Sequence, residues 1–208
     1  MIVSRNVQRQ MEETGWIRRM VEEGIMMKKT YGEDRVFDFS LGNPVVEPPG
    51  KLKEALLDAL REPSPGMHRY MPNNGFEGVR ADIADYLRGR YGQDFSAKHV
   101  YMTAGSAGGL NILLKSMLGK GDEVIVPSPY FMEFKYYIES HGGILRTVDA
   151  DDEFQIDVAA IDRAITRKTK AIILNSPNNP TGVVYREDRL RELAALLYGH
   201  REKGRTIY

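Results

Sequence analysis

The sequence contains no cysteine, no long apolar run and no excess of charge of either sign. Without cysteine, the chain forms no disulfide, no thiolate metal site and no cysteine nucleophile. The longest apolar stretches, such as residues 171–174, are far too short to cross a bilayer. Lysine plus arginine and aspartate plus glutamate both number 29, so nothing in the overall charge favours nucleic acid as a partner.

Two further absences concern histidine and the N-terminus. The four histidines show no close spacing on one helix face, so we expect no histidine metal site. Arg5 and Arg9 have no apolar run behind them, which argues against a signal peptide. The remaining composition, with 42% hydrophobic and 28% charged residues in 208, is that of a globular protein of one or two domains. We therefore expect a cytoplasmic protein that binds neither nucleic acid nor membrane.

Helical and strand patterns alternate along most of the chain. Apolar residues three or four apart predict helices over residues 14–30, 52–59, 75–91, 110–118, 130–140, 157–166 and 186–198, the first capped by Thr14 and stopped by Gly32. Short apolar runs predict strands over residues 37–41, 99–103, 123–126, 144–148, 170–175 and 205–208. Alternating strands and helices form βαβ units, so we expect an α/β fold with a mostly parallel sheet and helices on both faces.

The loop-rich composition of residues 42–50 suggests a domain boundary there. We expect residues 1–47 to form an N-terminal arm and small-domain segment, and residues 48–208 to belong to a larger domain. Ligands bind at the carboxyl ends of the strands in open α/β sheets. The loops after Thr103, Val126 and Asn175 are therefore the candidate binding loops.

The loop of residues 103–109 is rich in small residues, follows a predicted strand and opens a helix. Free N–H groups at a helix N-terminus favour a phosphate, and the Thr103 and Ser106 hydroxyls add donors. A tight turn without a ligand is an equally good interpretation. The glycine spacing fits neither a dinucleotide-binding nor a P-loop motif, and Pro127 stands where a dinucleotide ribose would need an acidic residue.

Three other loops are less informative when each is taken alone. Residues 127–131 include aromatic rings that could stack on a planar cofactor, although core packing is the commoner fate of such rings. Residues 175–182 combine prolines, a glycine and asparagine amides at a strand end, which is typical of a binding loop but also of a simple chain reversal. Residues 68–80 alone predict only a helix start.

In their order and spacing, the four loops resemble those of aminotransferases of pyridoxal-phosphate (PLP) fold type I, the aspartate aminotransferase class. The matching motifs are Tyr70-x-Pro-x-x-Gly75-x-x-x-x-Arg80, Thr103-Ala-Gly105-Ser106, Gly121-Asp-Glu-Val-x-x-Pro127-x-Pro-Tyr130 and Asn175-x-Pro-x-Asn179-Pro180-Thr181-Gly182. The resemblance spans roughly residues 35–208. It implies that the cofactor is PLP and that residues 48–208 are the first part of the large PLP-binding domain.

The resemblance also implies roles for individual residues. Gly105, Ser106 and Ala107 would hold the PLP phosphate. Tyr130 would stack on the pyridine ring, with Phe131 as the alternative if the register slips by one. Asn179, in a peptide bond with Pro180 that can be cis, would hydrogen-bond the phenolic oxygen and stabilise its anion. Gly42 would lie near the substrate carboxylate, and Tyr70 would reach the phosphate of a neighbouring subunit, which implies a homodimer with shared sites.

Three residues of the family have no counterpart in the 208 residues: the pyridinium aspartate, the Schiff-base lysine and the substrate-carboxylate arginine. We therefore assign no catalytic residue. Because a sheet that stops as a strand begins would leave an open apolar edge, we expect the chain to be one portion of a full enzyme, inactive alone. The parent would transfer amino groups between an amino acid and a 2-oxo acid. The alternatives are a non-catalytic PLP-fold fragment or binding protein, and a PLP-dependent lyase.

Overall fold

The computed structural model of the chain describes residues 2–40, 42, 46–62 and 65–208, with the side chains of Asn6 and residues 13–18 left out. Contacts divide the chain into two compact units, Met1–Tyr70 and Met71–Tyr208. The expected boundary at residues 47 and 48 concerns the domains of a full family member, and it stays a prediction.

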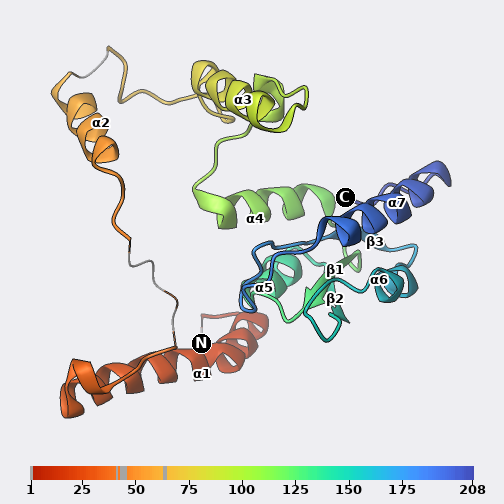
Figure 1. Cartoon of the computed structure of the whole chain (residues 1–208), viewed down its shortest axis with the longest axis horizontal. Coiled ribbons are helices and arrows are strands. Elements are labelled where there is room, and N and C mark those ends of the chain that lie inside the picture. The colour runs from red at the N-terminus through yellow and green to blue at the C-terminus, as the bar shows by residue number, and fades with distance from the viewer. Residues whose placement is uncertain (1, 41, 43–45, 63–64) are drawn as a thin grey trace. The chain divides into compact units, whose positions relative to one another are not determined.

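The first unit contains α1 (Arg5–Tyr31), the short 3-10 helix η1 (Glu33–Arg35) and α2 (Gly50–Arg61) (Figure 1). The prediction that Thr14 caps the first helix was wrong. Ser4 is the cap, and its hydroxyl accepts a hydrogen bond from the Val7 N–H at 3.3 Å. No glycine or proline interrupts residues 5–14, so the helix extends back to the first residue that can cap it. The predicted stop at Gly32 is confirmed, with a φ of 94° there.

The strand predicted over residues 37–41 was also wrong for its described part, residues 37–40; Leu41 lies outside the described residues. Phe37 and Phe39 are 82% and 93% exposed, and Asp38 directs the segment back to α1 instead. Its carboxylate accepts hydrogen bonds from Ser40 Oγ at 2.6 Å and Lys28 Nζ at 2.9 Å. These hydrogen bonds, from Ser40 first and then Lys28, lower the pKa of Asp38. Local polar contacts have thus replaced strand pairing.

The second unit alternates helices and strands after residue 104. Its elements are α3 (Glu77–Tyr91), η2 (Ala97–His99), α4 (Gly105–Met117), β1 (Glu123–Ser128), α5 (Glu133–Glu139), β2 (Ile144–Asp149), α6 (Val158–Ala164), β3 (Thr169–Ile172) and α7 (Glu187–Glu202). These elements confirm the predicted helices and strands from residue 110 to residue 202 within a few residues at each end.

The predicted strand at residues 99–103 does not form. Residue 99 ends η2, and residues 100–103 have no strand partner in the part of the chain that the structure describes. In this segment the Met102 N–H donates to the Asn74 carbonyl at 3.2 Å, a contact with a loop. A strand is defined by its ladder of hydrogen bonds, and an apolar segment without a neighbouring strand stays extended coil.

The three strands form a parallel sheet in the order β2-β1-β3. Along β3, the Tyr208 N–H donates to the Lys170 carbonyl at 3.0 Å, and the Tyr208 carbonyl accepts from the Ile172 N–H at 2.8 Å. These two bonds flank Ala171 in the pattern of parallel pairing. The strand predicted over residues 205–208 is not formed: none of these residues is in a strand, and Tyr208 contributes only these two backbone hydrogen bonds beside β3.

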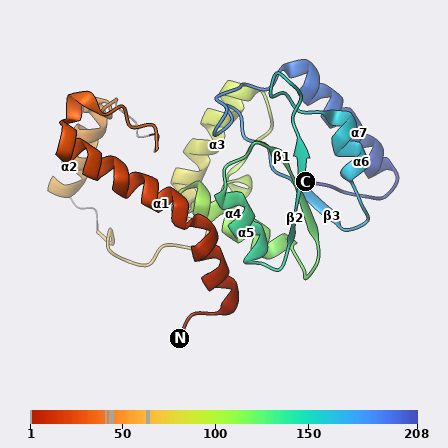
Figure 2. The same ribbon diagram turned by 90° about the horizontal axis from the view of Figure 1, so that it is seen from below.

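Helices cover both faces of the sheet, as predicted (Figure 2). Val124 and Val126 point to a core cluster with residues of α4 and α5, while Ile125 between them packs with residues of α6 and α7. This alternation follows from the two-residue period of a strand. Both faces of β1 are buried, which explains the continuous apolar run of residues 124–127 within it. Within the described residues, no helix combines the length and the apolar character needed to span a bilayer.

Candidate functional site

The N-terminus of α4 has the local geometry of an anion-binding turn. Gly105 begins the helix with a φ of +73°, a left-handed conformation that glycine adopts without steric cost. Ala104 at the N-cap has no side chain that could accept from the first turn, and the Thr103 hydroxyl donates to the Gly105 carbonyl instead, at 3.0 Å. The Gly105 N–H donates to the Thr103 carbonyl at 2.9 Å, so the N–H groups that remain available to a ligand are those that follow it in the first turn of α4.

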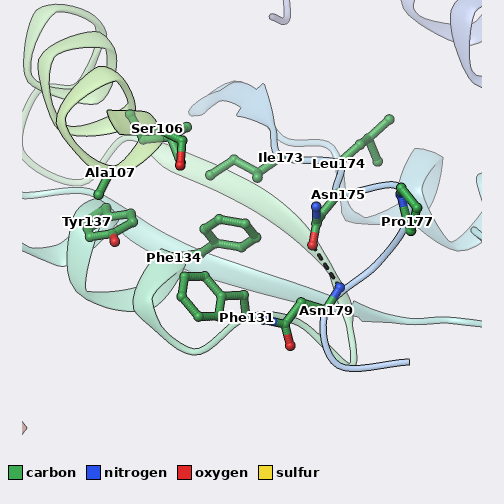
Figure 3. A pocket seen from close by; sticks show the side chains of 11 residues that line it. Ser106, Ala107, Phe131, Phe134, Tyr137, Ile173, Leu174, Asn175, Pro177 and Asn179 are labelled. Carbon is green, nitrogen blue, oxygen red and sulfur yellow. Dashed lines mark hydrogen bonds between the residues drawn. The ribbon is translucent and has the colours of Figure 1, made fainter. Parts of the chain in front are cut away.

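A cavity of about 490 Å³ opens beside this turn (Figure 3). Its volume lies within the range of about 300–1,000 Å³ that is usual for small-molecule sites. The lining comes from α4, from the loop after β1 with α5, and from the loop after β3. The lining residues are Ser106, Ala107, Leu110, Phe131, Phe134, Tyr137, Ile173, Leu174, Asn175, Pro177 and Asn179.

Three aromatic rings, those of Phe131, Phe134 and Tyr137, form part of the cavity wall. Phe131 and Phe134 contact each other edge to face, with ring centroids 5.5 Å apart and planes at 83°. Tyr130, the ring that we predicted to stack on the cofactor, is not among the lining residues. Tyr130 and Phe131 both pack against the core cluster of α4 and α5, but of the two only Phe131 lines the cavity. The geometry therefore favours Phe131, the alternative that lies one residue further along the chain.

Asparagine amides lie across the cavity from Ser106 and Ala107 in Figure 3. The Asn179 N–H donates to the side-chain oxygen of Asn175 at 2.8 Å, and this hydrogen bond restrains the conformation of the loop. The Asn179–Pro180 peptide bond is cis, as the motif suggested, and the Ser128–Pro129 and Ser176–Pro177 bonds are cis as well. The Asn179 side chain remains exposed and able to bond a ligand.

None of the described residues that line the cavity carries a charge. Attraction for an anion must therefore come from the α4 N-terminus, whose partial positive charge is worth about 0.3–1 kcal/mol, and from hydroxyl and amide donors. The rest of the wall is apolar and aromatic. The cavity thus suits a small planar molecule with an anionic group at the α4 end and a polar oxygen at the asparagine end.

The most deeply buried carboxylate lies at the opposite end of β1. The Glu123 side chain is 4% exposed and accepts hydrogen bonds from Arg146, at 2.8 and 3.1 Å, and from Thr166 Oγ1 at 2.5 Å. Burial alone would raise the pKa of Glu123, but the hydrogen bonds from Thr166 and Arg146, together with the positive charge of Arg146, lower it. Because the cavity begins beyond the carboxyl end of β1, Glu123 stabilises the sheet and takes no part in the site.

Two of the predicted site residues, Gly42 and Tyr70, belong to the first unit. Tyr70 is fully exposed, and Gly42 has no atom within 4 Å of the position that a Cβ would take. Their predicted roles, near the substrate carboxylate and at a neighbouring subunit's phosphate, stay predictions. The structure brings Ser106, Ala107 and Asn179 together around the cavity. Gly105 directly precedes Ser106 at the start of α4.

The sequence interpretation missed several lining residues. Phe134 and Tyr137 lie three residues apart in α5 and share one face of that helix, so the helical period could have found them. Leu110 follows Ser106 and Ala107 by one turn of α4, which places it on the same side. Asn175 stood in the motif as a loop residue without a role.

The sheet and its edge define a class of protein. It is an α/β protein in which a helix N-terminus, an aromatic ring and asparagine amides meet at the carboxyl edge of a parallel sheet. Residues 34–202 match the family model described as aminotransferase class I and II. The chain belongs to this family, and its fold is that of the N-terminal part of a fold type I PLP enzyme.

Individual relatives agree with the family. The chain is 34% identical to a probable aspartate aminotransferase of Methanocaldococcus jannaschii over 76% of this chain and 42% of that protein. Among solved structures, an amino transferase from Eubacterium rectale matches with a TM-score of 0.90 and 34% identity, covering 100% of this chain and 53% of that one. Aspartate aminotransferase from Thermus thermophilus matches at 0.77 and 31%, covering 88% and 47%. The chain thus spans about half the length of the relatives it matches.

Proposed function

We propose that this chain is the cofactor-cradling part of an aminotransferase that exchanges the amino group of an amino acid with a 2-oxo acid, and that the cavity beside α4 binds PLP. Aspartate is the first donor to test, because it appears in the names of several relatives. PLP, when bound, supplies an electron sink for the substrate carbon that carries the amino group. The chain's own residues bind and orient it.

The observation that carries this proposal is the composition of one cavity. Ser106 and Ala107 come from the start of α4, and the Phe131 ring and Asn179 come from two separate loops at one edge of the sheet; all four line the same space. PLP needs these groups: donors for a phosphate, a ring beside a flat pyridine and an amide for a phenolic oxygen. Its phosphate would lie at the α4 N-terminus, where backbone N–H groups and the Ser106 hydroxyl can donate.

Phe131 takes the stacking role in this proposal, in place of Tyr130, because only Phe131 lines the cavity. A phenylalanine ring offers the same flat apolar face without a hydroxyl. The Asn179 amide would donate to the phenolic oxygen, favour its ionised form and so lower its pKa. The homodimer, the roles of Tyr70 and Gly42 and the cytoplasmic location are part of the same proposal.

The 208 residues alone are proposed to bind PLP without turnover. None of the described residues that line the cavity is a lysine, an aspartate or an arginine, so the cavity wall has no amine for a covalent bond and no carboxylate for the pyridine nitrogen. The same observation favours the second candidate, a PLP-fold protein that binds the cofactor without catalysis. A PLP-dependent lyase is the alternative within the enzyme class.

Binding is tested with 4′-deoxypyridoxine 5′-phosphate, a PLP analogue without the aldehyde that would react with surface lysines. Equilibrium dialysis against the 208-residue chain should show at least about tenfold tighter binding of the phosphate ester than of 4′-deoxypyridoxine, since the α4 turn binds the phosphate. Ser106→Ala should reduce that preference, while Ser116→Ala, in the last turn of α4, should leave it unchanged. Equal affinity for the two analogues contradicts the proposed cofactor site.

The reaction is tested on the full-length protein that carries this chain. It is incubated with PLP, 2-oxoglutarate and a panel of amino donors that includes aspartate, and the transfer of the amino group is followed. Transfer without elimination supports the aminotransferase; elimination of the donor supports the lyase. If PLP is bound but no donor reacts, the binding protein is the better description.

A further inference from the structure

We propose that Asn178 is a positioning residue, which joins the two loops of the cavity and sets the Asn179 amide at a fixed place relative to the Phe131 ring. The inference rests on the proposed PLP site and goes one step beyond it. Asn178 does not line the cavity itself. It acts through its neighbours on either side of the site.

The Asn178 side chain is a buried polar group, and its residue is 6% exposed. Its Nδ2 donates to the Pro129 carbonyl at 3.1 Å and to Thr181 Oγ1 at 2.9 Å. The first bond joins residues 49 apart in sequence, one in the loop after β1 and the other in the loop after β3. Because β1 and β3 are parallel neighbours, their carboxyl ends lie side by side and one amide can span the two loops.

The backbone of Asn178 is held as firmly as its side chain. Its N–H donates to the Val183 carbonyl at 2.8 Å, and its carbonyl accepts from the Gly182 N–H at 2.7 Å. These bonds close the Asn175–Gly182 loop on itself, and Asn179 follows directly in the chain. The side-chain bond to Pro129 then fixes this closed loop to the segment that leads through Tyr130 to Phe131.

Only an amide suits this position. Both acceptors, a carbonyl and a hydroxyl oxygen, face the NH₂ group, and both of its hydrogens are used. Aspartate has nearly the same shape but no donor, and it would place a negative charge against the Pro129 carbonyl. A buried acceptor that loses its donor is costly, so the loops would separate. Asn178→Asp is therefore the sharpest single change.

The first measurement needs no ligand. Hydrogen exchange of the 208-residue chain is compared between wild type and Asn178→Asp. Exchange should become faster in residues 175–182 and also in residues 130–134, which lie 41 or more positions earlier in the sequence, whereas α7 should not change. Unchanged exchange in residues 130–134 overturns the inference, because the two loops would then be independent.

The second measurement uses bound 4′-deoxypyridoxine 5′-phosphate, whose absorbance reports the ionisation of its phenolic oxygen. If Asn178 sets the place of the Asn179 amide, Asn178→Asp should weaken binding by about fivefold or more and raise the pKa of that oxygen, in the same direction as Asn179→Ala. A variant that loses stability in circular dichroism but binds the analogue with unchanged affinity and pKa shows a merely structural role and overturns the inference.

Matched variants complete the experiment. Thr181→Ser keeps the hydroxyl that Asn178 bonds and should behave as wild type, whereas Thr181→Val removes one of the two acceptors and should show a smaller effect of the same kind. Thr181→Val keeps the inference testable if Asn178→Asp does not fold. Val184→Ala changes an exposed neighbour of the loop and should have no effect.

The two proposals fail separately. If the wild-type chain does not bind the analogue, yet Asn178→Asp loosens both loops, the PLP site is contradicted and the connection between the loops stands. If the analogue binds and neither loop responds, the PLP site stands and the role of Asn178 is rejected.

Discussion

Gly75 has no room for a side chain. Its φ is +94°, and a Cβ there would lie 2.3 Å from Met102 Cγ and 2.8 Å from Met102 Cβ. We predict that Gly75→Ala lowers the free energy of unfolding by about 1–3 kcal/mol, because alanine would be strained in its backbone and would displace Met102. Urea unfolding followed by circular dichroism measures the change.

Gly89, inside α3, is the matched control. It has an ordinary φ and no atom within 4 Å of its missing Cβ. Gly89→Ala should raise the free energy of unfolding by roughly 0.5–1 kcal/mol, the usual gain of alanine over glycine in a helix. If both alanine variants shift stability in the same direction, the explanation by local geometry is wrong.

The roles of single residues were harder to predict from the sequence than the helices and strands. The motif places an aromatic ring at the cavity, but the choice between Tyr130 and Phe131 depends on how the chain turns after β1, and that turn is set by contacts with other segments. Asn178 stood unnoticed beside Asn179 for a similar reason. Its importance lies in a bond to a residue 49 positions away, which no local pattern reveals.

At the level of elements, α4 begins without a capping side chain. Ala104→Asp would supply one, and we predict a rise in the free energy of unfolding of about 0.5–2 kcal/mol. The same carboxylate would occupy the free N–H groups and repel a phosphate, so binding of 4′-deoxypyridoxine 5′-phosphate should weaken at least about tenfold. Equilibrium dialysis and urea unfolding measure the two effects.

Pro49→Asp is the control for this prediction. Pro49 is the N-cap of α2, which also lacks a capping bond, and no cavity-lining residue belongs to that helix. The variant should leave the affinity for the analogue unchanged. Tight binding by Ala104→Asp would show that the first turn of α4 does not bind the phosphate.

The start of β1 should make the sheet sensitive to acid. The folded-state pKa of Glu123 lies below its ordinary value of 4.5. The ionised carboxylate therefore contributes stability that is fully present above about pH 4.5 and is lost as the pH falls through the lowered pKa. We predict that Glu123→Gln lowers the free energy of unfolding at pH 7 by about 1–3 kcal/mol and that the difference from wild type shrinks below about pH 4.

Glu153 provides the comparison for that change. It pairs with Arg186 at 2.8 Å, but its side chain is 72% exposed, and surface pairs contribute little. Glu153→Gln should alter stability by less than about 1 kcal/mol at pH 7. Urea titrations of the three proteins across the pH range give both results, and a constant deficit of Glu123→Gln at all pH values would contradict the assignment.

The sequence predicted helices and strands correctly where each strand packs against the helices that follow or precede it in the chain. β1, β2 and β3 and the helices between them supply their own partners, so local apolar patterns were sufficient. The segments at residues 37–40 and 99–103 carry similar patterns but have no adjacent strand among the described residues, and neither forms a strand. An apolar run predicts burial, whereas a strand also requires a partner for its backbone.

At the scale of the whole molecule, the two units differ in what stabilises them. The second unit contains both core clusters, with Leu114, Val124, Ile125, Ile138, Ile156 and Ile161 almost fully buried. In the first unit, α2 has no buried residue, and Leu52, Leu56 and Leu60 on it are exposed. A helix of 12 residues is marginal in water without tertiary packing.

This difference predicts unequal protection of backbone amides in the 208-residue chain. Amides of β1 should exchange hydrogen only on global unfolding, because both faces of the strand are covered, whereas those of α2 should exchange through local opening at least about a hundredfold faster. Amides of α7, which buries Leu193, are the control and should be slow like those of β1. Residue-resolved hydrogen exchange measures all three. If α2 is protected as strongly as β1, its leucines are covered in solution. A second copy of the chain is then the first partner to test, by measuring whether the protection of α2 rises with protein concentration.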